Sequence, residues 1–127
     1  MTKNRAGKPP SQRQLRVGEQ VRQAISDMLR RGDIYDPELN SVSVTITEVS
    51  ISPDLKNAVA YAVPLGNDDG ENIIKALNRN SSQFKHYIAK NIDLRAHPRI
   101  SFKLDTAFDY AEEITHLLNK AKQDGQE

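Results

Sequence analysis

The pattern of hydrophobic and polar positions begins with a helical repeat near the N-terminus. Apolar residues recur there at steps of three and four, which places them on one helix face: Val17, Val21, Ala24 or Ile25, and Met28. Ser11 and Gln14 have the spacing of a capping box, and Gly32 can adopt the left-handed backbone that ends a helix. The pattern therefore predicts an amphipathic helix from Ser11 to about Arg31.

The period changes to two at residue 42, in a β-branched stretch typical of a strand. The alternation changes parity near Glu48, which predicts a β-bulge. The segment Ser52-Pro53-Asp54 favours a turn that Asp54 orders. A second apolar stretch covers residues 58–63, and we expect Pro64 and the loop Gly66-Asn67-Asp68-Asp69-Gly70 to end it. The short connection between the two stretches predicts an antiparallel hairpin.

Helical spacing returns after Asp69, which can cap the next helix. One apolar stripe contains Ile73, Ile74 and Leu77, and a second contains Phe84, Ile88 and Ile92, with Lys85, His86 and Lys90 towards water. The stripes are separated by Asn80-Ser81-Ser82. Because Asn tolerates left-handed backbone and Ser is a good N-cap, we expect one helix to stop here and another to start at an angle.

The last part of the chain predicts a strand and a helix. Ile100, Phe102 and Leu104 alternate with polar residues after Pro98, and a final helix is expected to start after Asp105 or Thr106. The order helix, strand, strand, helix, kink, helix, strand, helix predicts an α+β fold, a three-stranded sheet with helices on one face. We expect one domain over residues 11–122, a flexible basic tail over 1–10 and a polar tail over 123–127.

Composition narrows the possible chemistry. The 127 residues include no Cys, which excludes disulfides and Cys-type zinc sites. The basic first ten residues lack the apolar stretch of a signal peptide, and no apolar run approaches the roughly 20 residues of a membrane span. We therefore expect a cytoplasmic protein.

No motif for catalysis, a metal or a nucleotide is found. The three histidines, His86, His97 and His116, lie on different predicted elements. Glu113 and His116 form only half of a di-iron helix signature, and the acidic loop 67–71 lacks EF-hand spacing, so a turn with a helix cap is the simpler interpretation. We expect no enzyme activity, no catalytic residues, no metal and no cofactor.

Charge is divided into blocks along the chain. Residues 1–31 contain eight Lys or Arg and two acidic residues, which gives a net charge of +6. Residues 32–70 contain one Lys and seven acidic residues, which gives a net charge of −6. Residues 71–103 hold seven bases against two acids, a net of +5. Two separated basic segments could form one face for a polyanion, although solvated surfaces alone would give the same pattern.

The second basic block resembles a nucleic-acid-binding layout. KH domains bind single-stranded nucleic acid with two helices separated by a break, and the order of elements here is similar: the second helix carries basic residues and a basic β-strand follows it. The G-x-x-G motif with which KH domains clamp the nucleic acid is absent from this sequence. The candidate RNA contacts, each expected to meet phosphate, are Arg13, Arg16, Arg79, Lys85, Lys90, Arg95, Arg99 and Lys103. Asn80, Ser81 and Ser82 form the expected kink. Phe84 and Phe102 are interpreted as core rather than as base-stacking residues.

Three segments resemble the ribosome-binding factor A family. They are the stretch Arg13-Gln14-Leu15-Arg16-Val17, the turn and strand from Ser52 to Tyr61, and the segment from Leu94 to Asp105, which is similar to the signature L-R-x-x-P-x-l-x-F-x-x-D. The resemblance covers residues from about 13 to 118. One departure is that Asn80-Ser81-Ser82 stands where the family typically has an Ala-x-Gly kink.

The resemblance implies a type II KH-like fold and a role in ribosome biogenesis. It implies binding to the immature small (30S) subunit and its 16S rRNA, help with 16S rRNA 5′-end processing, and growth in the cold. It implies no catalysis and no cofactor, and a ribosome-associated GTPase is expected by analogy as a release partner. We expect a monomer.

Two other functions remain open at the level of sequence. A generic KH-like RNA- or DNA-binding module would share the basic residues but would bind free oligonucleotides without a ribosomal subunit. A protein-interaction adaptor would instead use the acidic hairpin or the acidic last helix, and its binding would survive nuclease treatment.

Overall fold

The computed structural model describes residues 9–40, 42–65, 69–92 and 97–106. The elements in chain order are α1 (Gln12–Arg31), α2 (Pro37–Asn40), β1 (Ser43–Ile51), β2 (Asn57–Leu65), α3 (Gly70–Arg79), α4 (Ser81–Asn91) and β3 (Arg99–Leu104). The predicted order is confirmed as far as β3, apart from the short α2, which was not predicted. The predicted final helix and polar tail fall on residues 107–127, outside the described residues.

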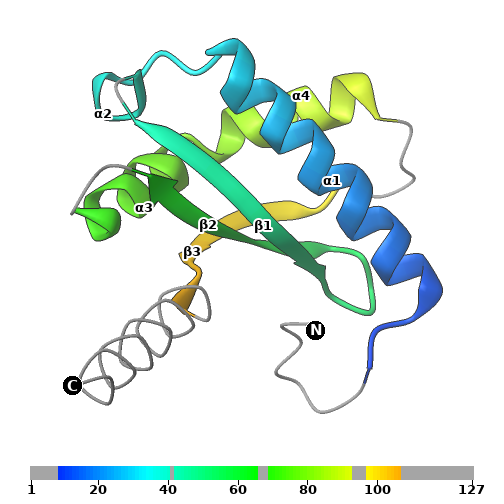
Figure 1. The fold of residues 1–127 in the computed structure, drawn as a ribbon. Helices are drawn as coiled ribbons and strands as arrows, with labels where there is room; N and C mark the ends of the chain where they lie inside the picture. The colour runs from blue at the N-terminus through cyan, green and yellow to red at the C-terminus, as the bar shows by residue number, and fades with distance from the viewer. Residues whose placement is uncertain (1–8, 41, 66–68, 93–96, 107–127) are drawn as a thin grey trace, which may run out of the picture.

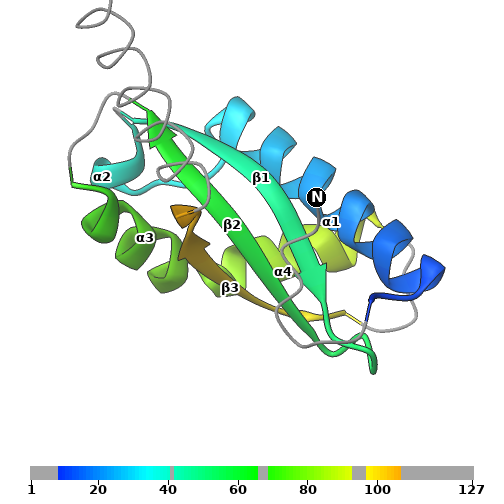
Figure 2. The same cartoon turned by 60° about the horizontal axis from the view of Figure 1, so that its bottom comes forward.

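The strands form one mixed sheet in the order β1-β2-β3. β1 and β2 pair antiparallel as predicted, and β2 and β3 pair parallel. Figures 1 and 2 show α1, α3 and α4 on one face of this sheet. The α+β class and the single helical layer are therefore confirmed.

The start and end of α1 follow the predicted local signals. Ser11 Oγ accepts a hydrogen bond from Gln14 N at 3.1 Å, and Gln14 Oε1 accepts one from Ser11 N at 2.8 Å. Gly32 ends the helix with a φ of 72°. The predicted apolar face is buried, including Val21 and Ile25. These contacts connect residues at most four apart, which explains why the sequence alone predicts them.

The hairpin contains the expected bulge, but its second strand is longer than expected. The register of β1 against β2 shifts between Ile46 and Glu48. β2 ends at Leu65, directly before the loop that was predicted to end it. The prediction is wrong for Pro64, which lies within the strand and pairs with Val44. β3 ends opposite Ala62, so beyond that point β2 has a neighbouring strand only on the β1 side and can accommodate a proline.

The core lies between the sheet and the helices. Phe84 of α4 is fully buried, and its ring centroid lies 5.0 Å from that of Phe102 on β3. Both phenylalanines are thus core residues, as expected. α1 approaches β1 closely at Gly18, where an added Cβ would lie 2.6 Å from the Val49 carbonyl oxygen. None of the described helices is long and apolar enough to cross a membrane.

The break between α3 and α4 differs in detail from the prediction. It falls at Asn80 alone, and Ser81 and Ser82 are the first two residues of α4. The expected left-handed backbone is wrong, since Asn80 has φ −103° and ψ 13°. The expected serine cap is also wrong, because Asn80 occupies the N-cap position and makes no side-chain capping hydrogen bond. The reason is that its amide group binds elsewhere.

Candidate nucleic-acid interface

Three of the predicted contacts lie at the end of the sheet that holds the β1–β2 turn. Gln14 donates a hydrogen bond from Nε2 to the Ile51 carbonyl at 2.8 Å, which places the exposed Arg13 and Arg16 at this end. Arg99, also exposed, donates its backbone N–H to the Lys56 carbonyl at 2.8 Å. Residues far apart in the sequence therefore meet here, and Asp54 orders the turn as predicted by accepting hydrogen bonds from Ser52 Oγ and Lys56 N.

Lys85 and Lys90 lie on the exposed side of α4, opposite the buried Phe84 and Ile88. α4 packs against the C-terminal half of α1, where Arg31 Nη1 donates to the Tyr87 hydroxyl at 3.3 Å. A surface hollow of about 610 Å³ lies between the two helices and is lined by Met28, Ser82, Gln83, His86, Tyr87, Lys90 and Asn91. This hollow combines amide, aromatic and cationic groups next to the predicted contacts.

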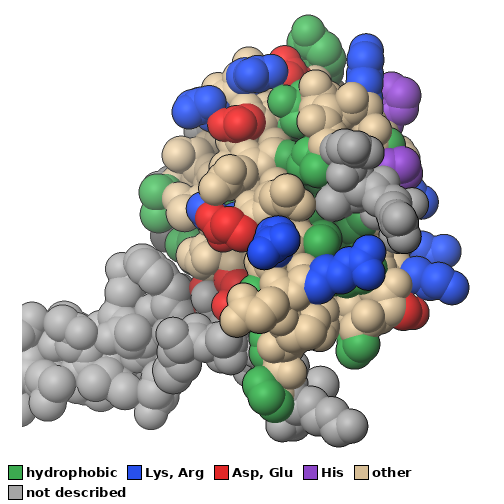
Figure 3. Space-filling view, turned by 90° about the vertical axis from the view of Figure 1, so that its right-hand side faces the viewer, with side chains coloured by type: hydrophobic (Ala, Val, Ile, Leu, Met, Phe, Trp, Pro, Cys, Tyr) green, Lys and Arg blue, Asp and Glu red, His purple; other side chains and the backbone are tan. Residues whose placement is uncertain are grey.

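Lys103 is a further described contact, and it shares the outward face of β3 with Arg99. Both side chains alternate with the buried Ile100 and Phe102, so they point away from the helical layer. The predicted contacts therefore come from both layers of the fold. Figure 3 shows one side of the molecule, on which Lys and Arg side chains are spread among fewer Asp and Glu, with His at one edge.

The side chains of the predicted contacts differ in whether they already form an ion pair with a carboxylate of the protein. Most of the described ones have side chains that make no hydrogen bond or ion pair with any other described residue: Arg13, Arg16, Lys85, Lys90, Arg99 and Lys103. Arg79 is the exception, because it is paired with Asp36 and approaches Glu38. Arg95 lies outside the described residues. Unpaired cations can bind phosphate without first breaking an internal contact.

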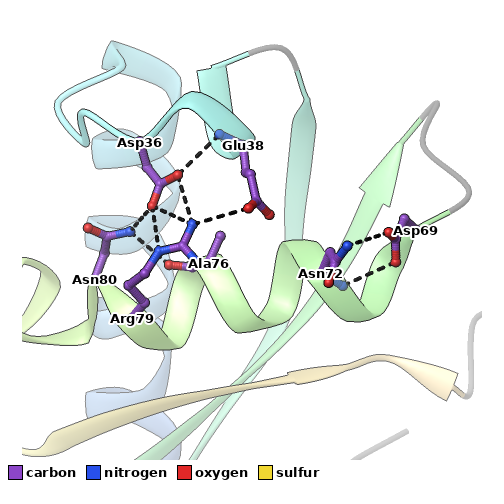
Figure 4. A network of polar contacts seen from close by, with 7 residues as sticks. All are labelled: Asp36, Glu38, Asp69, Asn72, Ala76, Arg79 and Asn80. Atoms are coloured by element: carbon purple, nitrogen blue, oxygen red, sulfur yellow. Dashed lines mark hydrogen bonds and ion pairs between the residues drawn. The ribbon is translucent and has the colours of Figure 1, made fainter.

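Arg79 belongs to a network around the Asp36 carboxylate (Figure 4), which is buried, with an exposed fraction of 6%. Oδ2 accepts hydrogen bonds from Asn80 Nδ2 at 2.8 Å and from Arg79 Nε at 3.0 Å. Oδ1 accepts from Arg79 Nη2 at 2.9 Å and from the Glu38 backbone N–H at 3.1 Å. The hydrogen bonds from Asn80 and Arg79 hold the pKa of Asp36 below its ordinary value.

Sequence analysis missed Asp36 and the residue before it. Tyr35 is 89% exposed although Ile34 and Asp36 on either side of it are buried. A signal was present, since Asp followed by Pro is typical of an N-cap and the first residue of a helix, and Asp36 does cap α2. Nothing local in the sequence indicated that the same carboxylate would bind Arg79 and Asn80.

The structure offers little support for other chemistry among the residues that it describes. No group of His, Asp and Glu there could hold a metal ion, and His86 and His97 are exposed. Asp69 caps α3 by accepting a hydrogen bond from Asn72 N at 3.3 Å, as predicted. The predicted half-signature of Glu113 and His116 lies outside the described residues.

Comparison with known proteins shows which family the chain resembles. The family model of ribosome-binding factor A matches residues 13–118. Ribosome-binding factor A of Paracoccus denitrificans is 48% identical over 122 residues, covering 94% of this chain and 88% of the relative. The crystal structure of ribosome-binding factor A from Thermus thermophilus has a TM-score of 0.60 at 21% identity, covering 72% of this chain and 94% of that one.

A homology model of Thermus thermophilus ribosome-binding factor A, fitted into a cryo-electron microscopy map of its complex with the 30S subunit, has a TM-score of 0.56 at 21% identity. It covers 70% of this chain and 91% of the other. The crystal structure and the fitted model share the fold of this chain, the family match extends over residues 13–118, and the relative covers 94% of the chain. The chain belongs to the ribosome-binding factor A family.

Proposed function

We propose that this protein binds the immature small ribosomal subunit through its 16S rRNA and assists late maturation of that subunit without catalysing a reaction. The observation that carries the proposal is family membership at 48% identity over most of the chain. A further support is that a homology model of the Thermus thermophilus homologue has been fitted into a map of its complex with the 30S subunit. The described part of the chain adds exposed cations without internal partners, which suit a phosphate backbone.

The contacts that we propose are phosphate contacts, which position the protein without reading base sequence. They are made by Arg13, Arg16, Lys85, Lys90, Arg95, Arg99 and Lys103. Ser82 is exposed beside Lys85, and α4 lacks a side-chain cap, so backbone N–H groups in its first turn can meet a phosphate oxygen. Arg79 is treated separately below because a carboxylate already holds it.

Family membership also supports the finer parts of the proposal. They are help with 16S rRNA 5′-end processing, a contribution to growth in the cold, and release by a ribosome-associated GTPase. A protein that works on ribosomal subunits acts in the cytoplasm, and no cofactor is required for binding. We propose that it acts as a monomer.

Cosedimentation with mature and immature small subunits across a salt series tests the proposal. We expect preferential binding to the immature subunit and a linear fall of log affinity with log salt concentration. Reversing two charges on α4, Lys85→Glu with Lys90→Glu, should abolish most of this binding. The control reverses two exposed lysines outside the proposed contacts, Lys56→Glu with Lys75→Glu, and should lose much less.

Each alternative function gives a different result in the same experiment. Equal binding to any RNA would indicate a generic KH-like module. Binding that survives nuclease treatment and ignores the α4 charge reversal would indicate a protein-interaction adaptor. Loss of helical circular dichroism in the double variant would mean that the lysines support the fold.

A further inference from the structure

We propose that Asp36 positions the junction between α3 and α4, and that Arg79 serves this junction instead of contacting rRNA. The first half concerns the free protein, and the second half rests on the proposed function. The inference reassigns one cation of the predicted contact set. It also adds to the interface a positioning residue that touches no RNA.

The first argument is the geometry around the carboxylate. Of the four hydrogen bonds that the Asp36 carboxylate accepts, three come from Arg79 and Asn80, the last residue of α3 and the residue at the break. Asp36 is 43 residues from Arg79 and 44 from Asn80 along the chain. The carboxylate therefore ties the loop after α1 to the point where the two helices meet (Figure 4).

The side-chain amide of Asn80 connects the two helices at the break. Its Nδ2 donates to the Ala76 carbonyl and to Asp36 Oδ2, each at 2.8 Å, and its Oδ1 accepts from Gln83 Nε2 at 2.8 Å. One buried amide group thus contacts the last turn of α3, the first turn of α4 and the Asp36 carboxylate. We call Asp36, Arg79 and Asn80 the clamp. Because the backbone of Asn80 is not left-handed, these side-chain contacts, and not a special backbone conformation, hold the bend.

The third argument concerns the guanidinium of Arg79. Its Nε and Nη2 groups both bind Asp36, at 3.0 and 2.9 Å, and Nη2 lies 3.6 Å from Glu38 Oε1. To grip a phosphate, this guanidinium would have to give up charge-assisted hydrogen bonds next to two carboxylates that repel the phosphate. Lys85 has no such competitor among the described residues.

The clamp would affect binding through the direction of α4. This helix begins at the junction and carries Lys85 and Lys90, whereas Arg99 and Lys103 are held by β3. A change in the bend at Asn80 would move the two lysines relative to the two cations of the strand. A rigid polyanion that contacts both sets would then be bound less well.

The experiment compares five single variants and the double variant Asp36→Asn with Arg79→Gln in binding to small subunits across a salt series. Asp36→Asn and Arg79→Gln test the clamp, Lys85→Gln is the contact control, and Lys75→Gln is an exposed cation one turn before Arg79 on the same helix. We expect each clamp variant to weaken binding roughly threefold to tenfold, and the double variant to be no weaker than the worse single variant.

The salt dependence separates positioning from contact. The slope of log affinity against log salt concentration should be the same for Arg79→Gln as for Lys75→Gln. For Lys85→Gln the slope should be shallower, by about the amount that one phosphate contact contributes. Arg79→Lys keeps the positive charge but loses the planar guanidinium that binds both carboxylate oxygens, and it should behave like Arg79→Gln. A flattened slope in Arg79→Gln with full binding by Asp36→Asn would overturn the proposal, and so would additive losses in the double variant.

Hydrogen exchange on the free protein keeps the two halves of the inference apart. We expect backbone amides around Asn80 to exchange faster in Asp36→Asn and Arg79→Gln but not in Lys75→Gln. Unchanged exchange in both clamp variants would refute the positioning role. If the wild type fails to bind small subunits, the proposed function fails while the exchange result still decides the junction. If Asp36→Asn does not fold, Arg79→Gln and Arg79→Lys carry the test.

Discussion

The starts of α1 and α4 are two helix N-termini that depend on side-chain hydrogen bonds of different range. At α1, Ser11 and Gln14 satisfy each other across three residues. At α4, the N-cap residue Asn80 does not cap its own helix and instead binds Asp36, 44 residues away. The same type of signal, a polar residue before an apolar stripe, therefore produces a cap in one place and a long-range clamp in the other.

The difference shows what decides how a polar residue is used at a helix start. Both Ser and Asn are good caps in isolation. Asn80 lies where a buried carboxylate arrives from another part of the chain. Its Nδ2 donates a charge-assisted hydrogen bond to Asp36, which orients the amide group, and its Oδ1 accepts from Gln83 Nε2 instead of from a backbone N–H group. The tertiary contact therefore prevails over the local preference.

The largest expected effect comes from removing the packing that holds α4. Phe84→Ala should destabilise the protein by about 3 to 5 kcal/mol, because the ring is fully buried and packs against Phe102. Urea denaturation measures this free energy. The exposed neighbour Lys85→Ala should change it by no more than about 0.5 kcal/mol. Similar values for the two variants would mean that α4 is held mainly by its junction.

Gly18→Ala tests whether the stability of α1 depends only on local interactions, as the hydrogen bonds at its two ends do. Helix propensity alone predicts a gain of about 1 kcal/mol for this exchange. The structure predicts a loss of about 1 to 3 kcal/mol, because the new Cβ would lie 2.6 Å from the Val49 carbonyl oxygen, and backbone atoms must move apart. Thermal denaturation gives the sign, and Gln20→Ala, at an exposed position of the same helix, controls for propensity.

A pair of serine variants compares the two helix starts directly. Ser11→Ala should cost about 1 kcal/mol, since it removes a capping hydrogen bond. Ser82→Ala should cost almost nothing, because Ser82 lies within the first turn of α4 and caps nothing. Chemical denaturation of both variants decides between the structure and the sequence-based expectation of a serine cap. An equal loss in the two would restore that expectation.

The smallest effect is the acid dependence of stability. Hydrogen bonds from Asn80 and Arg79 lower the folded-state pKa of Asp36 from its ordinary value of 3.8. The stabilisation due to this carboxylate is therefore complete above pH 3.8 and is lost as the pH falls through the lower folded-state pKa. We expect the stability difference between wild type and Asp36→Asn to be constant at higher pH and to shrink in this acid range.

Asp54 provides the local counterpart for that measurement. Its pKa is also lowered, chiefly by the hydrogen bond from Ser52 within the same turn. The change in the free energy of unfolding with pH that is due to Asp36 should become smaller when Arg79 is replaced by Gln. The change that is due to Asp54 should stay the same. A response of both carboxylates to Arg79 would point to general electrostatics instead of a specific clamp.

The elements that sequence analysis predicted correctly depend on short-range rules. The capping box at Ser11, the stop at Gly32, the bulge near Glu48 and the alternation of β3 all involve neighbours within a few residues. Side-chain periodicity and capping act over this range, so the sequence alone determined the element order and the buried faces. The motif resemblance in turn indicated the family.

The remaining features required the tertiary structure. The Asp36 clamp joins residues 43 and 44 apart, Gly18 is small because a neighbouring strand approaches it, and Pro64 continues β2 because β3 has already ended. The sequence identified Arg79 as a cation, but only the fold showed that it is already paired. The physical reason is that periodicity depends on chain neighbours, whereas the partner of a buried polar group is whichever residue the packed chain brings within hydrogen-bond distance.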